Sequence, residues 1–206
     1  MKKTIIYDFD GTLADNLQEM IHLFKKYAGK ELSQKDIKSL RSKRAQEAFR
    51  YLGISLFKIP WIIRQMRQDH SISIDKVYPI KGIKEVLYEL NKKGYQQGIV
   101  TSNSEENVKL FLKYHQLEVF NFIRTGSSFF GKDKVIRRLL KELYLKPNDV
   151  LYIGDEVRDC EAARKINIKM IAVTWGFNDE KILQKQNPEY LVRTPNELIK
   201  MLEKMN

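Results

Sequence analysis

The stretch that decides the fold is Thr4-Ile5-Ile6-Tyr7-Asp8-Phe9-Asp10-Gly11-Thr12-Leu13. It opens with a short apolar run, which gives way to two acidic residues and then a glycine. Such a run is typical of a buried strand whose carboxyl end opens into a loop. We therefore predict a strand over residues 4–9 that brings Asp8 and Asp10 to the edge of a sheet.

Strand and helix patterns alternate through most of the remaining chain. Further strands are predicted at 95–101, 120–124, 150–153, 169–174 and 189–192, and helices at 83–93, 105–114, 132–143, 156–166 and 195–205. This alternation favours a parallel sheet covered by helices on both faces. With right-handed crossovers, the result is a doubly wound α/β fold. Ligands of such sheets bind beyond the carboxyl ends of the strands.

One segment interrupts the alternation. Residues 16–78 contain no convincing strand, but they contain helical patterns at 17–27, 42–52 and 56–69, and Ser33 is a plausible N-cap for a helix that ends at Leu40. We predict an α/β core of residues 1–15 and 79–206, into which an all-helical domain of residues 16–78 is inserted. Residues 79–82 would form the hinge by which the chain returns to the core.

Composition excludes several classes of protein. The chain has 206 residues and a single cysteine, Cys160, so it cannot form an intramolecular disulfide. No apolar run approaches the roughly 20 residues of a membrane helix. The apolar run near the N-terminus is too short for a signal peptide, and Asp8 and Asp10 interrupt it. We expect a cytoplasmic protein with no membrane partner.

The formal net charge of +11 raises the question of nucleic acid. The basic residues, however, are spread along helical stretches and interleaved with acids, and no RNA-binding signature, zinc module or basic tail stands out. A solvated surface that attracts anionic small molecules is therefore favoured over a nucleic-acid site.

Four short polar elements lie at strand ends or at a helix start. They are Asp8-Phe9-Asp10, Thr101-Ser102-Asn103, Gly131-Lys132, and Gly154-Asp155 with Asp159. Because the carboxyl ends of parallel strands meet at one edge, we expect these side chains to converge. The sequence thus predicts a group of carboxylates accompanied by a hydroxyl, an amide and a lysine.

This set of groups is suited to phosphoryl transfer. A phosphate dianion repels carboxylates, so the acidic group needs a cation such as Mg²⁺, which oxygen ligands bind well. Lys132 supplies a further positive charge, and Ser102 and the backbone near Asn103 can donate hydrogen bonds to a phosphoryl oxygen. A carboxylate nucleophile divides hydrolysis into two easier steps, and a second carboxyl can act as the acid and base.

With these motifs the sequence resembles the haloacid dehalogenase superfamily, and especially its phosphoglycolate-phosphatase-like branch. Residues 8–13 match the first family motif, Ser102-Asn103 the second, Lys132 the third, and residues 154–159 the fourth, in the family's order and spacing. The resemblance covers about residues 4–180 and implies a Rossmann-like core. It also implies that the helical insertion is a cap that closes over the site and selects the substrate.

The resemblance also implies a role for each motif residue. Asp8 would be the nucleophile and a metal ligand, and Asp10 the general acid and base, with its backbone carbonyl on the metal. Asp155 would be the third protein ligand of the metal. Asp159 would position Lys132 or the metal-bound waters, and Ser102, Asn103 and Lys132 would bind the substrate phosphate.

Some assignments have alternatives within the sequence. Lys134 could replace Lys132, and Thr101 could replace Ser102 if the strand register moved by one residue. Glu156 could reach the metal. A basic side chain of the insertion could contact substrate, although each is more typical of a solvated helix; the candidates are Lys25, Lys26, Arg41, Lys43, Arg44, Arg64 and Arg67.

Three other functions share parts of this pattern. A response-regulator receiver would lack the helical insertion, and the family's dehalogenases lack the second aspartate, so Asp10 favours phosphate chemistry. A phosphomutase of the beta-phosphoglucomutase type has the same core and remains the alternative. We expect a Mg²⁺-dependent phosphatase that acts on a small phosphorylated metabolite. The sequence leaves its physiological substrate and its oligomeric state open.

Overall fold

The sheet has the predicted doubly wound α/β architecture. A computed structural model describes residues 4–62, 64–65, 77–125 and 131–205 of the chain. All neighbouring strands are parallel, in the order β5-β4-β1-β6-β7-β8. Their bounds are β1 Thr4–Tyr7, β4 Gln96–Val100, β5 Phe122–Arg124, β6 Val150–Gly154, β7 Lys169–Val173 and β8 Tyr190–Val192.

Strand β1 occupies the middle of this sheet. Tyr7 pairs with Ile99 of β4 on one side and with Ile153 of β6 on the other. All four residues of β1 are buried, as expected for a strand covered on both faces. The chain that leaves β1 therefore emerges between the ends of β4 and β6, where the predicted motifs at 101–103 and 154–159 begin.

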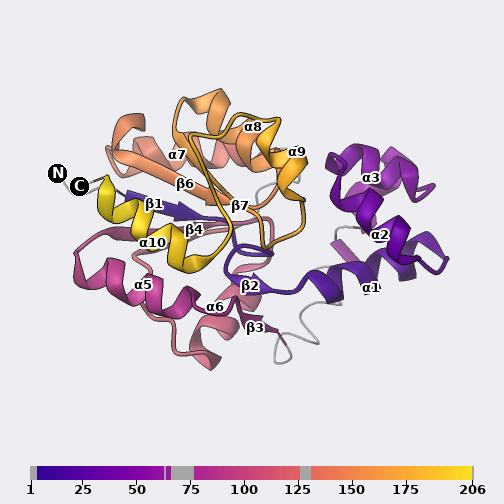
Figure 1. Ribbon diagram of the computed structural model, residues 1–206, viewed down its shortest axis with the longest axis horizontal. Helices are drawn as coiled ribbons and strands as arrows, with labels where there is room; N and C mark the ends of the chain where they lie inside the picture. The colour runs from indigo at the N-terminus through magenta and orange to yellow at the C-terminus, as the bar shows by residue number, and fades with distance from the viewer. Residues whose placement is uncertain (1–3, 63, 66–76, 126–130, 206) are drawn as a thin grey trace.

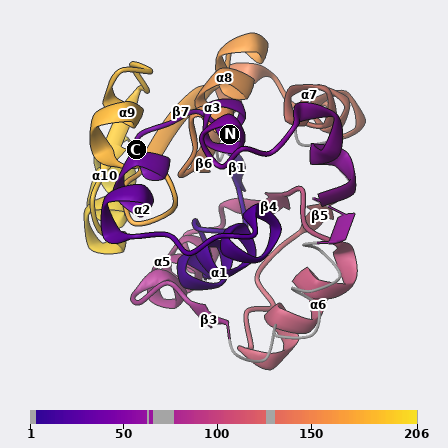
Figure 2. The same cartoon turned by 90° about the vertical axis from the view of Figure 1, so that its right-hand side faces the viewer.

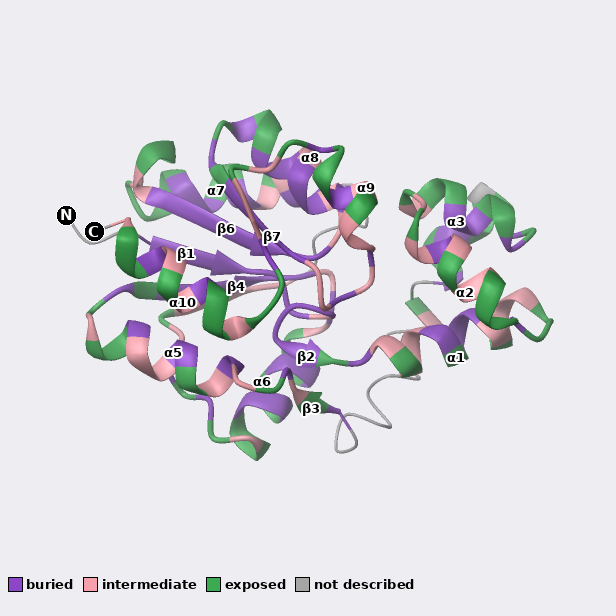
Figure 3. Cartoon of the chain, in the orientation of Figure 1, coloured by how far each residue is buried: buried purple, intermediate pink, exposed green. Residues whose placement is uncertain are grey.

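Two layers of helices cover the sheet (Figures 1 and 3). Helices α5 (Ile83–Lys92), α6 (Glu105–Tyr114) and α10 (Pro195–Lys204) pack on one face, in a core that includes Phe9, Val108 and Leu198. Helices α7 (Lys132–Glu142), α8 (Val157–Ile166) and the short α9 (Glu180–Gln184) cover the other face, around Ile136, Cys160 and Leu183. Helix α9 was not predicted from the sequence.

The helical insertion lies beyond the carboxyl ends of the strands, at the opposite end of the molecule from the two termini (Figure 1), and its helices face the viewer in Figure 2. It contains α1 (Leu17–Ala28), α2 (Gln34–Arg41), α3 (Ala45–Tyr51) and the 3₁₀ turn η1 (Leu56–Lys58). Ser33 caps α2, as predicted, by accepting a hydrogen bond from the backbone of Asp36. These helices bury a core of their own, which includes Leu40 and Phe49.

Two short strands connect the insertion to the sheet domain. Strand β2 (Ala14–Asp15) pairs antiparallel with β3 (Tyr78–Pro79), so both chain crossings lie side by side. Neither strand was predicted, because two-residue strands have no detectable period. The predicted return hinge at 79–82 begins within β3, and Gly82 has a φ of 89°, which favours glycine.

Other boundaries differ modestly from the prediction. Strand β1 ends at Tyr7 instead of Phe9, since the carbonyl of Phe9 accepts hydrogen bonds from the backbone of Thr12, Leu13 and Ala14 in a tight turn. Of the helix predicted over 56–69, residues 56–58 form a 3₁₀ turn, residues 59–62 and 64–65 are helical, and the rest lie outside the described residues.

Helix α3 begins at Ala45 instead of residue 42, because Ser42, Lys43 and Arg44 contact the sheet domain. Among the helices that the structure describes, none is long and apolar enough to cross a membrane.

Candidate active site

Asp8 lies at the centre of the site, where the chain leaves β1. Its carboxylate is buried, with Oδ2 2.8 Å from Nζ of Lys132 and Oδ1 accepting a hydrogen bond of 2.8 Å from the backbone N–H of Phe9. Burial raises the pKa of Asp8 to about 7; Asp159 adds to this, whereas the positive charges of Lys132 and Arg158 oppose it. The carboxylate is thus close to a cation and shielded from bulk water.

Lys132 joins Asp8 to the fourth motif. It is the first residue of α7, and its buried ammonium lies 2.6 Å from Oδ1 of Asp159. Burial alone would lower the pKa of Lys132. The negative charges of Asp159 and Asp8 outweigh this effect, so the pKa is raised. Lys134 is exposed. Of the two lysines that the sequence left open, the structure places only Lys132 against Asp8.

Asp159 is anchored from three sides. Besides Lys132, it accepts hydrogen bonds from the hydroxyl of Tyr152 at 3.2 Å and from the backbone of Glu156 at 3.0 Å. The last of these belongs to the cap of α8. Asp159 is therefore a fixed partner of the Lys132 ammonium.

Asp155 follows β6 and is enclosed by backbone. Its Oδ1 accepts a hydrogen bond of 2.7 Å from the Thr12 hydroxyl, and its Oδ2 accepts one of 2.7 Å from the backbone N–H of Phe177. A Cβ atom on Gly11 or Gly176 would lie within 2.4 Å of Oδ2. Burial, followed by the charges of Glu156 and Asp8, raises the pKa of Asp155 well above its usual range.

Three buried carboxylates converge on one another. Asp8, Asp155 and Asp159 each offer an oxygen within 4.8 Å of the other two. Such a cluster of negative charge in a buried place is unfavourable without cations, which agrees with the raised pKa of Asp8 and Asp155. An all-oxygen donor set is also what a hard divalent cation prefers. The residues present therefore fit a bound metal ion.

Asp10 lies outside this cluster and is held by two amides. The side-chain nitrogens of Asn16 and Asn103 donate hydrogen bonds of 2.6 Å and 3.0 Å to its Oδ1. Asn16 in turn accepts a hydrogen bond from the backbone of Gly11. Asp10 is half-buried, and Asp8 is fully buried. The two carboxylates of the first motif thus have different surroundings, as two different chemical roles require.

The second motif forms a turn after β4. The Thr101 hydroxyl is buried and accepts a hydrogen bond from the backbone of Asn103, while Ser102 is half-buried. The Asn103 side chain also accepts from the backbone of Ser104 and from the Asn107 amide. Thr101 is therefore used within the turn. Asn103 orients Asp10, a contact that the sequence did not predict.

Other residues of the site were assigned no definite role from the sequence. Arg158, whose side chain is 16% exposed, pairs with Glu156 at 2.6 Å, and its charge acts on Asp8. The indole of Trp175 donates to the carbonyl of Thr12, behind the first motif. Asn16 lies in a polar run that looks like an ordinary helix start. Arg158 sits inside a recognised motif and Trp175 follows the strand predicted at 169–174, so these two carried a sequence signal, whereas Asn16 did not.

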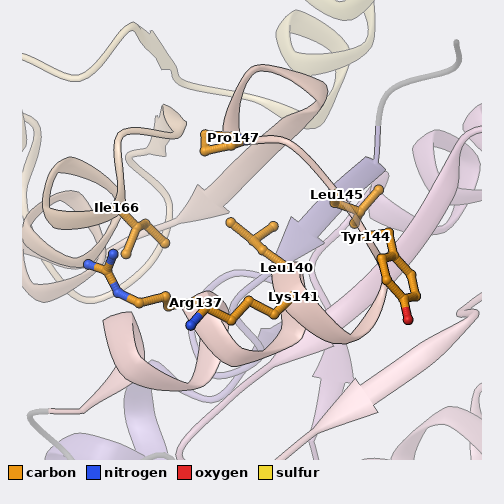
Figure 4. A pocket seen from close by; sticks show the side chains of 7 residues that line it. All are labelled: Arg137, Leu140, Lys141, Tyr144, Leu145, Pro147 and Ile166. Atoms are coloured by element: carbon orange, nitrogen blue, oxygen red, sulfur yellow. The ribbon is translucent and has the colours of Figure 1, made fainter.

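The structure also contains a hollow away from these residues. It has a volume of about 430 Å³ and is lined by Arg137, Leu140, Lys141, Tyr144, Leu145, Pro147 and Ile166 (Figure 4). These residues gather around the C-terminal half of α7, whereas Lys132 is at the N-terminal end of that helix. The hollow is therefore separate from the carboxylate cluster.

Comparison with known proteins agrees with this geometry. Residues 5–173 match the model of the family described as haloacid dehalogenase-like hydrolase. A phosphoglycolate phosphatase of Synechococcus elongatus is 28% identical over 98% of both chains. Pyrophosphatase PpaX of Bacillus mycoides is 24% identical, again over 98% of both chains.

Solved structures show the same fold. A haloacid dehalogenase-like hydrolase from Streptococcus pneumoniae superposes with a TM-score of 0.79 at 24% identity over 98% of both chains. A hydrolase from Pseudomonas syringae does so with a TM-score of 0.77 at 20% identity over 99% of both chains.

The predicted fold class and enzyme class, a phosphoric monoester hydrolase, are confirmed. The family match spans most of the chain, and this protein belongs to the haloacid dehalogenase-like hydrolases.

Proposed function

We propose that this protein is a Mg²⁺-dependent phosphatase that hydrolyses a small phosphomonoester through an aspartyl-phosphate on Asp8. The observation that carries the proposal is the placement of Asp8. Its carboxylate is buried beside the ammonium of Lys132, and oxygens of Asp155 and Asp159 lie within 4.8 Å. A nucleophilic carboxylate needs nearby positive charge to receive a phosphate dianion, and this arrangement supplies it.

The metal would be held by the carboxylates of Asp8 and Asp155 together with the backbone carbonyl of Asp10. When bound, the cation would offset the carboxylate charge and stabilise charge on the transferring phosphoryl group. Thr12 and the backbone of Phe177 already fix both oxygens of Asp155. Gly11 and Gly176 leave room for that carboxylate where any other residue would fill it. Asp159, which pairs with Lys132, would keep that ammonium directed toward the phosphate.

Asp10 would protonate the leaving oxygen and then remove a proton from the attacking water. The amides of Asn16 and Asn103 favour this role because they fix one of its carboxyl oxygens. The Ser102 hydroxyl would donate a hydrogen bond to the phosphoryl group, whereas the backbone N–H groups of Thr101 and Asn103 already donate within the core and the turn. A water molecule acting at phosphorus would then release phosphate and restore the Asp8 carboxylate.

The substrate would be enclosed by the helical insertion of residues 16–78, acting as a cap over the core of residues 1–15 and 79–206. The named relatives point to phosphoglycolate and pyrophosphate as the first substrates to examine. A phosphomutase of the beta-phosphoglucomutase type remains the second candidate, since it would use the same carboxylates. We favour hydrolysis, because the two relatives described above are named as a phosphatase and a pyrophosphatase.

A screen of phosphorylated metabolites tests this proposal. Wild-type protein and Asp8→Asn are assayed side by side for phosphate release from phosphoglycolate, pyrophosphate, sugar phosphates, nucleotides and a generic aryl phosphate, with Mg²⁺ and with excess chelator. We expect Mg²⁺-dependent release by the wild type only. Equal release by Asp8→Asn would refute the nucleophile, and full activity in chelator would refute the metal's role. Conversion of a sugar phosphate to its isomer without phosphate release would identify a mutase.

A further inference from the structure

Asn178 links the insertion to the active site. This residue lies in the loop that follows β7, and its side chain is buried. Its Oδ1 accepts a hydrogen bond of 2.9 Å from the backbone N–H of Val157, in the first turn of α8. Its Nδ2 donates to the carbonyls of Arg41, at 2.9 Å, and Lys43, at 3.0 Å. The amide oxygen of Asn178 thus binds to the core, and the amide nitrogen binds to the insertion.

The same loop encloses Asp155. The backbone N–H of Phe177 donates to the Asp155 carboxylate, and the backbone N–H of Asn178 donates to the Asp155 carbonyl at 3.3 Å. Gly176 packs so closely that a Cβ atom would lie 2.2 Å from Oδ2 of Asp155. A displacement of residues 176–178 would therefore disturb the hydrogen bond that fixes this carboxylate.

The insertion holds the loop from the opposite side through residues 41–44, which we call the docking segment. The Arg41 guanidinium donates to the carbonyls of Gly176, at 3.1 Å, and Phe177, at 3.0 Å. The backbone N–H of Asp179 donates to the Arg41 carbonyl at 3.0 Å, and the Ser42 hydroxyl donates to the Asp179 carboxylate.

Most of these contacts use backbone groups with fixed directions, so they specify one docked position. The ring of Phe177 completes the contact from the loop, since it packs edge-on against Phe24, 5.7 Å between centroids, in the core of the insertion.

We propose that Asn178 is a positioning residue that couples docking of the insertion to the placement of Asp155. The proposal rests on the proposed function, in which Asp155 holds the metal and the insertion encloses the substrate. Because coupling between two sites is reciprocal, an ordered Asp155 loop favours docking, and a docked insertion favours the arrangement of Asp155 that receives a cation. The choice of asparagine follows, since only a side-chain amide offers one acceptor and two donors at this length.

Asn178→Asp should remove the hydrogen bonds to the insertion while keeping the one to the core. The substitution keeps an acceptor for the backbone of Val157 but places a carboxylate oxygen against the carbonyls of Arg41 and Lys43. Asn187→Asp is the control for charge, because Asn187 is exposed on the same domain. Arg41→Met is the second test variant, since it removes the two hydrogen bonds that the Arg41 guanidinium donates to the loop without altering a core residue.

Hydrogen–deuterium exchange measures docking without any need for activity. In metal-free protein we expect amides of residues 41–51 to exchange about tenfold faster in Asn178→Asp and Arg41→Met than in wild type, within the usual range of coupling between sites. Amides of β1 and β6 should be unchanged. Adding Mg²⁺ should slow exchange in residues 41–51 of wild type and of Asn187→Asp, and much less in the two test variants.

Kinetics on the substrate found in the screen provide the second measurement. A less populated docked state lowers apparent affinity in proportion, so KM should rise about tenfold while kcat changes less than about threefold. Unchanged exchange in residues 41–51 of both test variants would overturn the proposal, and so would equal loss of protection in β1 and β6. If no phosphomonoester is hydrolysed by wild type, the proposed function fails, but the exchange experiment still decides whether Asn178 couples docking to the loop.

Discussion

The carboxyl edge of the sheet and the helical insertion are built on different principles. At the edge, Asp8 follows β1, Asp155 follows the neighbouring strand β6, and Lys132 begins α7; each is fixed by hydrogen bonds or ion pairs within the core. The insertion has its own small core and reaches the sheet domain through β2, β3 and the docking segment. On the proposed function, the chemical step would belong to the edge of the sheet, and the choice of substrate to the insertion.

This difference predicts that substitutions at the edge alter the chemical step, while substitutions in the insertion alter binding. After the loss of activity expected for Asp8→Asn, the largest effect on kcat should come from Asp10→Asn. Loss of acid and base catalysis should lower kcat by roughly 10²–10⁴-fold. The amides of Asn16 and Asn103 can still contact the new side chain, so the melting temperature should change little. A kcat within tenfold of wild type would mean that another group transfers the proton.

Gly176→Ala should have the next largest effect, because a Cβ atom there would lie 2.2 Å from Oδ2 of Asp155. Overpacking of this kind costs about 1–3 kcal/mol in stability, and we expect kcat to fall with it. Gly53→Ala is the control from the insertion, with a φ of 76° and no atom near the added Cβ. It should lose about 1 kcal/mol to backbone strain and keep its kcat. Equal kcat in both variants would contradict the close packing around Asp155.

The stability of metal-free protein should depend on the charge of Asp8. Its pKa is about 7 in the folded chain and 3.8 without the fold, so the folded state favours the protonated form. The protonated Asp8 side chain therefore contributes to the free energy of unfolding. This contribution is complete below pH 3.8 and is lost as the pH rises to about 7. Asp8→Asn lacks the buried charge. In chelator at pH 8, its melting temperature should exceed that of wild type by a few degrees. This corresponds to a difference on the order of 1 kcal/mol in the free energy of unfolding.

The same comparison at lower pH supplies the control. At pH 5, wild-type Asp8 is largely protonated in the folded state, so the advantage of Asp8→Asn should shrink. Thermal unfolding of both proteins at pH 5 and pH 8 measures this difference in melting temperature. An advantage that is equal at the two values, or larger at pH 5, would show that burial does not raise the pKa of Asp8.

The smallest effect should come from Arg44→Ala in the docking segment. Arg44 pairs with Glu161 at 2.6 Å, but its side chain is 53% exposed. Exposed ion pairs contribute about 0–1 kcal/mol, so stability and kcat should both stay close to wild type. Arg41→Met, which removes hydrogen bonds to the loop beside Asp155, is the matched comparison. If Arg44→Ala weakened docking as much as Arg41→Met, docking would depend on charge instead of on directed backbone contacts.

The sequence predicted the core more completely than the insertion, for a physical reason. Strands such as β1 and β6 are continuous apolar runs, and the edge at which they end follows from parallel pairing. Asp8, Lys132 and Asp155 could therefore be brought together from the sequence alone. The orientation of Asp10 by Asn16 and Asn103 could not, because a hydrogen bond between side chains far apart in sequence leaves no period or composition signal.

Contacts of the insertion were the hardest to predict. Its helices could be located from their apolar spacing, and the N-cap Ser33 was identified correctly. Arg41 and Arg44 could only be grouped with other basic residues as solvated charges or substrate contacts. In the structure they instead contact the loop beside Asp155 and α8, respectively. Arg67, another of those basic residues, lies outside the described residues.

The most direct test of the central claim is to trap the phosphoryl group on the enzyme. Wild-type protein and Asp8→Asn are mixed with Mg²⁺ and a radiolabelled phosphomonoester that the wild type hydrolyses, quenched in acid, digested and mapped. Label bound to the wild type should be found on the peptide that contains Asp8 and should be lost on treatment with hydroxylamine. Asp8→Asn should carry none. Label on another residue, or equal labelling of both proteins, would contradict the assignment of Asp8 as the nucleophile.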